Sequence, residues 1–160
     1  MEIERKFLVL SDQYKRLGSS ELISQGYLNS DKNRTVRVRI QGSKATLTIK
    51  SATVEISREE YEYEIPLNDA KELLNRVCEK PIIEKTRYKI EYQNFVWEVD
   101  EFFGDNLGLV VAEIELEYPE QKFNKPDWIG EEVSHDQRYF NSSLIKNPFK
   151  NWHPIVNKNL

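Results

Sequence analysis

Glu2-Ile3-Glu4-Arg5-Lys6-Phe7-Leu8-Val9 opens the chain with charged and apolar side chains at alternating positions. Successive side chains of a β-strand point to opposite faces of the sheet. One face of a strand here would carry Glu2, Glu4 and Lys6, and the other would carry mainly Ile3, Phe7 and Val9. The stretch therefore predicts a β-strand with one ionised face and one apolar face.

The same period of two recurs along the chain and predicts about eight strands. Turn-forming sequences separate several of them, including Gln41-Gly42-Ser43 and Gly104-Asp105-Asn106, as expected between antiparallel strands. The predicted strands span residues 2–10, 22–28, 34–41, 44–50, 58–65, 82–92, 95–102 and 110–118. We therefore expect a mainly β protein of the α+β class with a mostly antiparallel sheet.

Two segments have helical spacing instead. Asn68 is a suitable N-cap for a helix over 69–78, in which apolar residues recur at helical intervals. Cys78 lies on the apolar side of this predicted helix, and we interpret it as a buried packing residue. A second helix is predicted from about residue 136 to about residue 146, and the tail 147–160 is predicted to be mostly irregular.

Composition limits the class of protein. The 160 residues include 39% hydrophobic residues, and they contain no linker rich in Gly, Ser or Pro, which predicts one domain over 1–160 with its barrel at about 2–118. The formal net charge of −4 argues against a nucleic-acid partner, although it does not exclude a small anionic ligand. No apolar run approaches the roughly 20 residues that a membrane helix needs. The single cysteine fits a reducing compartment, so we predict a cytoplasmic protein.

The charged strand faces sort by sign. Acid-rich faces are predicted for Glu2 and Glu4, for Glu60, Glu62 and Glu64, for Glu98 and Asp100, and for Glu113, Glu115 and Glu117. Base-rich faces are predicted for Arg37 and Arg39, for Lys50, and for Lys85, Arg87 and Lys89. A solvent-exposed sheet face is a sufficient explanation for any one strand. However, solvated faces usually mix the two signs, and like charges two residues apart on one face lie only about 7 Å from each other.

Such repulsion predicts that ligands compensate the charges. A hard divalent cation such as Mg²⁺ or Mn²⁺ prefers carboxylate oxygens, whereas phosphate is bound by arginine forks and lysine ammonium groups. If the sheet closes into a barrel, both sets would line one lumen. That arrangement favours phosphoryl-transfer chemistry, in which cations neutralise the charge of the reacting group. Apolar residues on the outer face of the sheet must be covered by helices or by a second subunit, so a homodimer is one of the expected alternatives.

Nine segments occur in an order and on strand parities that resemble a known family. They are Glu2-x-Glu4-x-Lys6, Gln25-Gly26-Tyr27-Leu28, Arg37-x-Arg39, Leu47-Thr48-Ile49-Lys50, Glu60-Tyr61-Glu62, Glu84-Lys85-Thr86-Arg87-Tyr88, Glu98-Val99-Asp100, Glu113-Ile114-Glu115, and Trp128-Ile129-Gly130-Glu131-Glu132-Val133 through Asp136-x-Arg138-Tyr139. Over residues 2 to about 145 the chain resembles the CYTH family, the triphosphate tunnel metalloenzymes, and in particular its short bacterial inorganic triphosphatases.

The resemblance implies an eight-stranded, closed antiparallel β-barrel with a charged interior, peripheral helices, and a helix at 136–146 that plugs the tunnel. It implies hydrolysis of a bound triphosphate with Mg²⁺ or Mn²⁺. The implied metal ligands are Glu2, Glu4, Glu62, Asp100, Glu113 and Glu115, with Glu60 and Glu98 as further candidates. The implied phosphate contacts are Lys6, Arg37, Arg39, Lys50, Lys85, Arg87 and Arg138. Tyr27 and Lys50 are the implied catalytic pair that activates water.

Several functions remain open at this point. An inorganic triphosphatase is favoured because no extra segment for recognising a base is evident, while a thiamine triphosphatase and an adenylate cyclase are alternatives. A non-catalytic domain that binds polyphosphate or nucleotide would use the same lumen. The many carboxylates argue against that domain, because an anion would bind more easily without them. For Tyr27, a packing role with a satisfied hydroxyl group is as good an interpretation as a catalytic one.

Overall fold

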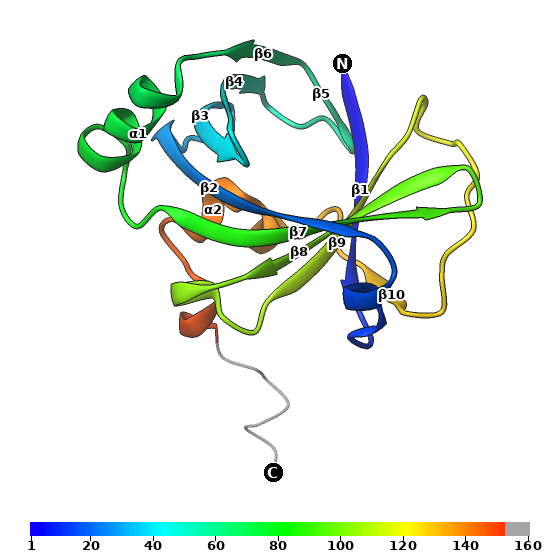
Figure 1. Cartoon of the computed structure of the whole chain (residues 1–160). Helices are drawn as coiled ribbons and strands as arrows, with labels where there is room; N and C mark the ends of the chain where they lie inside the picture. The colour runs from blue at the N-terminus through cyan, green and yellow to red at the C-terminus, as the bar shows by residue number, and fades with distance from the viewer. Residues whose placement is uncertain (153–160) are drawn as a thin grey trace.

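A single sheet of ten strands, every pairing antiparallel, forms the body of the protein in the computed structural model, which describes residues 1–152 (Figure 1). The strands are β1 (Glu2–Val9), β2 (Ser19–Asn29), β3 (Arg34–Gln41), β4 (Lys44–Ser51), β5 (Ser57–Arg58), β6 (Glu60–Glu64), β7 (Ile83–Tyr92), β8 (Phe95–Phe102), β9 (Val110–Glu115) and β10 (Ile129–Glu132). They follow the order β10-β1-β9-β8-β7-β2-β3-β4-β6, and β5 pairs with β1. This confirms the predicted fold class.

The sheet curls into a barrel that is nearly closed rather than closed. Ser57 and Arg58 pair with β1, and only two residues later Glu60 pairs with Lys50 of β4. The chain therefore crosses from β1 to β4 at this point, and no ladder joins β6 to β1 within residues 1–152. The predicted strand 58–65 is for this reason two strands with different partners, and the predicted total of eight strands was too low.

Other strand limits differ for local reasons. The predictions for β3 and β8 were correct, whereas β2 begins at Ser19 and is longer than predicted. Strand β9 ends at Glu115, because the chain then turns, with the Gln121 amide donating to the Tyr118 carbonyl at 3.1 Å. Strand β10 was not predicted, since four residues are too few to show a period of two.

Helix α1 spans Leu67–Arg76 rather than 69–78. Pro66 precedes the first turn with φ −59°, a value that suits the start of a helix, so Asn68 lies inside the helix and does not cap it. Ala70 and Leu74 are buried against β3 and β4, and Figure 1 shows α1 outside the barrel. Cys78 is buried as predicted, although it follows the helix.

The predicted second helix is two shorter elements. A 3₁₀ turn, η3 (Gln137–Tyr139), is followed by α2 (Asn141–Leu144), and the intervening Phe140 has extended backbone angles. The other 3₁₀ turns are η1 (Gln13–Arg16), η2 (Gly104–Asn106) and η4 (Phe149–Asn151). The last of these lies in the tail that was predicted to be irregular, and residues 153–160 of that tail lie outside the described part of the chain.

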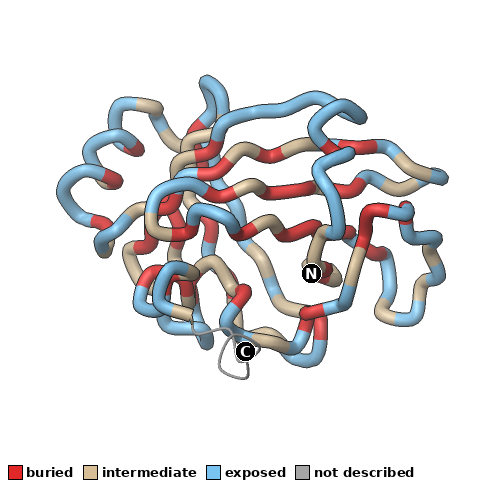
Figure 2. Tube along the Cα trace, turned by 90° about the horizontal axis from the view of Figure 1, so that it is seen from below, coloured by how far each residue is buried: buried red, intermediate tan, exposed pale blue. Residues whose placement is uncertain are grey.

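Apolar side chains pack on both faces of the sheet. On the inner face, Phe102 lies opposite the inward-facing Lys85 and clusters with Tyr27 and with Leu144 of α2. On the outer face a second cluster forms. Phe7 and Trp97 meet edge to face, with ring centroids 5.4 Å apart, and Phe123 packs against both from the segment that follows β9. Buried positions recur at intervals along the strands (Figure 2). The segment that contains Phe123 and helix α1 thus cover parts of the outer surface, whereas Tyr61 and Tyr63 on β6 remain exposed. No helix within residues 1–152 has the length and apolar character needed to span a membrane.

Candidate active site

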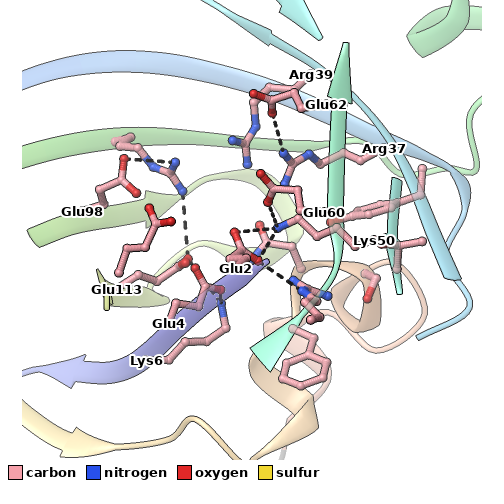
Figure 3. Close-up of a pocket in the computed structure, with 18 of the residues that line it drawn as sticks. Glu2, Glu4, Lys6, Arg37, Arg39, Lys50, Glu60, Glu62, Glu98 and Glu113 are labelled. Atoms are coloured by element: carbon pink, nitrogen blue, oxygen red, sulfur yellow. Dashed lines mark hydrogen bonds and ion pairs between the residues drawn. The ribbon is translucent and has the colours of Figure 1, made fainter. Parts of the chain in front are cut away.

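Charged side chains of both signs line a cavity of about 140 Å³ inside the barrel (Figure 3). Seven cationic residues line it: Lys6, Arg37, Arg39, Lys50, Arg58, Lys85 and Arg87. Seven acidic residues face them: Glu2, Glu4, Glu60, Glu62, Glu98, Glu113 and Glu115. Most of the candidate residues named from the sequence therefore meet in one place, and Arg58 joins them.

Strand register explains why these groups converge. In the β1–β9 ladder, Glu4 lies opposite Glu115 and Lys6 lies opposite Glu113. In the β2–β3 ladder, Tyr27 lies opposite Arg37. Residues directly opposite each other in an antiparallel pair share a face of the sheet. Because the charged parity of each strand faces the inside of the barrel, the pairing gathers acids and bases from distant parts of the sequence.

Glu4 and Glu113 form an acidic pair around Lys6. The Lys6 Nζ atom lies 3.3 Å from a carboxylate oxygen of each glutamate. Burial, and then the neighbouring Glu113 carboxylate, raises the pKa of Glu4 to about 8. Against the effect of burial, Lys6 holds the pKa of Glu113 well below its usual range. Together the two carboxyl groups keep a proton to higher pH than an isolated glutamate would, so a further cation would be favourable here.

A second ionic cluster joins Lys50 of β4 to side chains of β1, β5 and β6. The Lys50 Nζ atom lies 3.0 Å from Glu2 Oε1 and 3.3 Å from Glu60 Oε2, and Arg58 Nε donates to Glu2 Oε1 at 3.3 Å. Burial opposes ionisation of Glu2, but Lys50 and Arg58 lower its pKa to about 2. Burial and the nearby Arg37 lower the pKa of Lys50, although Glu2 acts in the opposite direction.

Asp100 forms ion pairs with two cationic residues, Lys85 and Arg87. Lys85 Nζ lies 2.7 Å from its Oδ2, and Arg87 donates to it with Nε at 2.8 Å and Nη2 at 2.9 Å. Asp100 is 1% exposed and is not among the residues that line the cavity. Although burial raises it, these two cations lower the pKa of Asp100 below its usual range. This arrangement suits a residue that positions Lys85 and Arg87. It suits the metal-ligand role predicted from the sequence less well.

Arg37 lines the cavity and leaves one buried nitrogen of its guanidinium group unpaired within residues 1–152. Its Nη2 donates to Thr48 Oγ1 at 3.3 Å, and the Thr48 hydroxyl group donates to Glu62 Oε1 at 3.0 Å. Arg37 Nε is buried and has no hydrogen-bond partner within the described residues. An unpaired buried donor is costly, so Arg37 would gain from a change of hydrogen-bond partners when an anion binds.

Arg138 is the predicted contact that the structure places elsewhere. Its side chain is 55% exposed, pairs with Asp136 at 2.6 Å, and stacks over Trp152 with a guanidinium-to-centroid distance of 5.0 Å. It is not among the residues that line the cavity, whereas Phe140, Asn141 and Ser142 from the following turn are. The helix was predicted to be continuous, and the break at Phe140 changes which side chains face inward.

Sequence reasoning also missed a polar bridge across the cavity wall. Gln25 is fully buried; its Oε1 accepts from Arg39 Nε at 2.9 Å and Nη2 at 2.7 Å. Its Nε2 donates to Asn141 Oδ1 at 2.8 Å, and Lys85 Nζ donates to the same oxygen at 2.8 Å. Gln25 belongs to the segment that contains Tyr27, which was a usable signal. Nothing in the sequence pattern singled out Asn141.

The donor chemistry fits a hard divalent cation, because Glu2, Glu4, Glu113 and Glu115 present carboxylate oxygens from neighbouring strands β1 and β9. No group of three acidic, histidine or cysteine side chains forms a ready-made metal cage within residues 1–152. Lys6 pairs with Glu4 and Glu113, and Lys50 pairs with Glu2, so ligation by these three acids requires them to exchange an ammonium partner for the ion.

Comparison with known proteins gives consistent results. The sequence profile of the CYTH domain matches residues 1–146. The chain is 56% identical over 151 residues to an inorganic triphosphatase of Acetivibrio thermocellus, covering 94% of this chain and 97% of that protein. It is 38% identical over 147 residues to an inorganic triphosphatase of Nitrosomonas europaea, covering 89% and 95%. The crystal structure of an inorganic triphosphatase superposes with a TM-score of 0.66 at 35% identity, covering 91% of this chain and 94% of that one.

Proposed function

Because the chain belongs to the CYTH domain family, we propose that it is a metal-dependent triphosphatase that hydrolyses inorganic triphosphate inside its barrel. The observation that carries this proposal is the meeting of seven cationic and seven acidic side chains around one cavity. A triphosphate brings several negative charges of its own, so cations alone would not balance both it and the acids. A divalent ion, which family membership implies, supplies the missing positive charge.

Cavity size favours an inorganic substrate. The cavity measures about 140 Å³, below the roughly 300–1,000 Å³ of pockets that enclose drug-sized organic ligands. A chain of three phosphates needs no room for a base or a sugar. A nucleotide or thiamine ester would leave its organic part outside the charged cavity, where these residues offer it no contacts. The relatives named as inorganic triphosphatases support the same choice.

We assign the residues as follows. The phosphate chain is bound by Lys6, Arg37, Arg39, Lys50, Lys85 and Arg87. Glu2, Glu4, Glu113 and Glu115 would hold Mg²⁺ or Mn²⁺, with Glu60, Glu62 and Glu98 near enough to help. The ion supplies charge neutralisation to the phosphate oxygens when it is bound. Tyr27 and Lys50 both line the cavity, and there they would orient the attacking water and accept its proton at Lys50 Nζ.

Three further expectations accompany this function. A small-molecule triphosphate is the expected partner. A cytoplasmic location stays a prediction from the sequence. A homodimer remains an expectation from the sequence. The exposed side chains of Tyr61 and Tyr63 on β6 are apolar surface that a second subunit could cover.

The proposal is tested by supplying the purified protein with tripolyphosphate, ATP or thiamine triphosphate, each with Mg²⁺ or Mn²⁺. Orthophosphate, pyrophosphate and cyclic AMP are measured separately. We expect orthophosphate and pyrophosphate from tripolyphosphate, with a higher kcat/KM than for either organic substrate, and no turnover in excess EDTA. Cyclic AMP as the main product of ATP, or no product from any substrate, would contradict the proposal.

A further inference from the structure

Asn141 holds a position in the cavity wall to which no role has been assigned. It is the first residue of α2 and lies directly after the extended Phe140. Its Oδ1 accepts hydrogen bonds from Lys85 Nζ and from Gln25 Nε2, both at 2.8 Å. Through these contacts the 137–144 segment is joined to β7 and β2, and Asn141 lines the same cavity as the two catalytic candidates.

Hydrogen-bond chemistry fixes which way the amide of Asn141 faces. Arg39 can only donate, so the Gln25 atom that contacts its guanidinium group must be Oε1. The other end of Gln25 is then its Nε2 donor, which requires an acceptor on Asn141. Lys85 can also only donate and contacts the same atom. Two independent donors therefore identify that atom as Oδ1.

The orientation leaves the other half of the amide available. With Oδ1 facing Lys85 and Gln25, the Nδ2 group turns away from both, and it donates to no protein atom within residues 1–152. Lys85 Nζ has three protons and uses two, on Asp100 and Asn141. Asn141 and Lys85 both line the cavity, so an amide with a free donor group and a cationic side chain belong to the same part of its wall. Groups of both kinds bind phosphate oxygens.

We propose that Asn141 is a substrate-contacting residue whose Nδ2 donates a hydrogen bond to a phosphate oxygen of the bound triphosphate, next to Lys85. This inference rests on the proposed function. It replaces the contact that sequence reasoning assigned to Arg138: the 137–144 segment contributes a neutral amide to the substrate rather than a guanidinium group. Because the same side chain also holds Lys85 and Gln25, it couples that segment to the phosphate-binding wall.

A purely structural role is the competing explanation, and Asn141→Asp separates the two. Aspartate has the same shape and keeps an acceptor for Lys85 and Gln25, which a charge would strengthen. It replaces the free NH₂ group by an oxygen, so it removes the donor and adds repulsion toward phosphate. A structural role therefore predicts that Asp is tolerated, whereas a phosphate contact predicts a large loss of substrate affinity.

The kinetic experiment compares the wild-type protein with Asn141→Asp, Asn141→Ala and the control Asn68→Asp, which makes the same charge change on the exposed side of α1. We expect Asn141→Asp to raise the KM for tripolyphosphate by about 10- to 100-fold, the range for losing a hydrogen bond to a charged group. The Tm should stay near that of the wild type, and Asn68→Asp should leave KM unchanged. A KM for Asn141→Asp within twofold of the wild-type value would overturn the inference. Should Asn141→Asp fail to fold, Asn141→Ser removes the amide without adding charge, and a wild-type KM for that variant would be equally contrary.

A second readout needs no turnover. In excess EDTA, the rise in Tm caused by tripolyphosphate reports binding to the folded protein alone. We expect a clear rise for the wild type and for Asn68→Asp, and a smaller one for Asn141→Asp. Equal rises in all three proteins would overturn the inference. If the wild type binds tripolyphosphate but does not hydrolyse it, the proposed function fails while the Asn141 contact is still decided by this measurement.

Discussion

Lys50 Nζ lies 3.0 Å from Glu2 Oε1, so a residue assigned to proton transfer is paired with one assigned to the metal. Each of the two controls the charge of the other: burial apart, Lys50 is the main reason that the pKa of Glu2 falls to about 2. Ligation of a metal ion by Glu2 would remove one of the two carboxylate partners of Lys50, and Glu60 Oε2, at 3.3 Å, would remain. The site depends on exchange of ionic partners, and substitutions in it should separate into those that change catalysis and those that change stability.

Glu4→Gln should abolish most of the activity while the fold survives. Glutamine keeps the size of the side chain but loses the charge that a divalent ion needs, so we expect kcat to fall by about 100-fold or more and to require higher Mg²⁺. Stability should not fall at neutral pH, because the pKa of Glu4 is raised to about 8 and its side chain is already largely uncharged there. Mg²⁺-dependence of turnover and Tm are the measurements. Glu91→Gln, an exposed site, is the control, and full activity in Glu4→Gln would refute the assignment.

Tyr27→Phe should lower kcat by about 100-fold and change KM little, because the hydroxyl group is assigned to positioning water rather than to binding phosphate. Steady-state kinetics with tripolyphosphate test this. Tyr118→Phe removes a hydroxyl group from an exposed tyrosine and should have no effect. If the kinetic constants of both variants match the wild type, Tyr27 is a packing residue, which its place in the core beside Phe102 would also explain.

Asp100→Asn should destabilise the protein by about 3–5 kcal/mol, because it leaves Lys85 and Arg87 buried without their shared counter-ion. The folded pKa of Asp100 lies below that of an ordinary carboxyl group, about 3.9. Its contribution to stability is therefore complete above that value and is lost as the pH falls below it toward the folded pKa. Urea unfolding at pH 7 and at acid pH should show a difference between wild type and variant that shrinks below about pH 4. Unchanged stability with weakened metal affinity would instead make Asp100 a ligand.

Arg138→Ala should leave kcat and KM within about twofold of the wild-type values, because the guanidinium group pairs with Asp136 and lies outside the cavity. A small loss of stability, about 0.5–1 kcal/mol, is expected from its stacking on Trp152. Arg39→Ala is the contrasting variant and should lower kcat/KM strongly. A tenfold or greater fall for Arg138→Ala would restore Arg138 as a phosphate contact.

Strand periodicity predicted the composition of the cavity wall well. A period of two assigns each side chain to a face whatever strand lies beside it, so Glu2, Glu4, Lys6 and Arg37 could be grouped without knowing the fold. Ordered motifs then predicted the antiparallel barrel. The gap at β5 could not be predicted in this way, because a two-residue pairing leaves no periodic signal.

The amino-acid sequence predicted the class of the fold and most of the charged residues that line the cavity. Which charge neutralises which follows from the tertiary structure alone. It assigned Asp100 to Lys85 and Arg87, and it turned Asn141 instead of Arg138 toward the cavity. Whether a residue is at an odd or an even position along a strand decides on which face of the sheet its side chain lies. Distances between side chains on different elements depend on strand register and on a non-repeating turn such as Phe140, which neither alternation nor composition encodes.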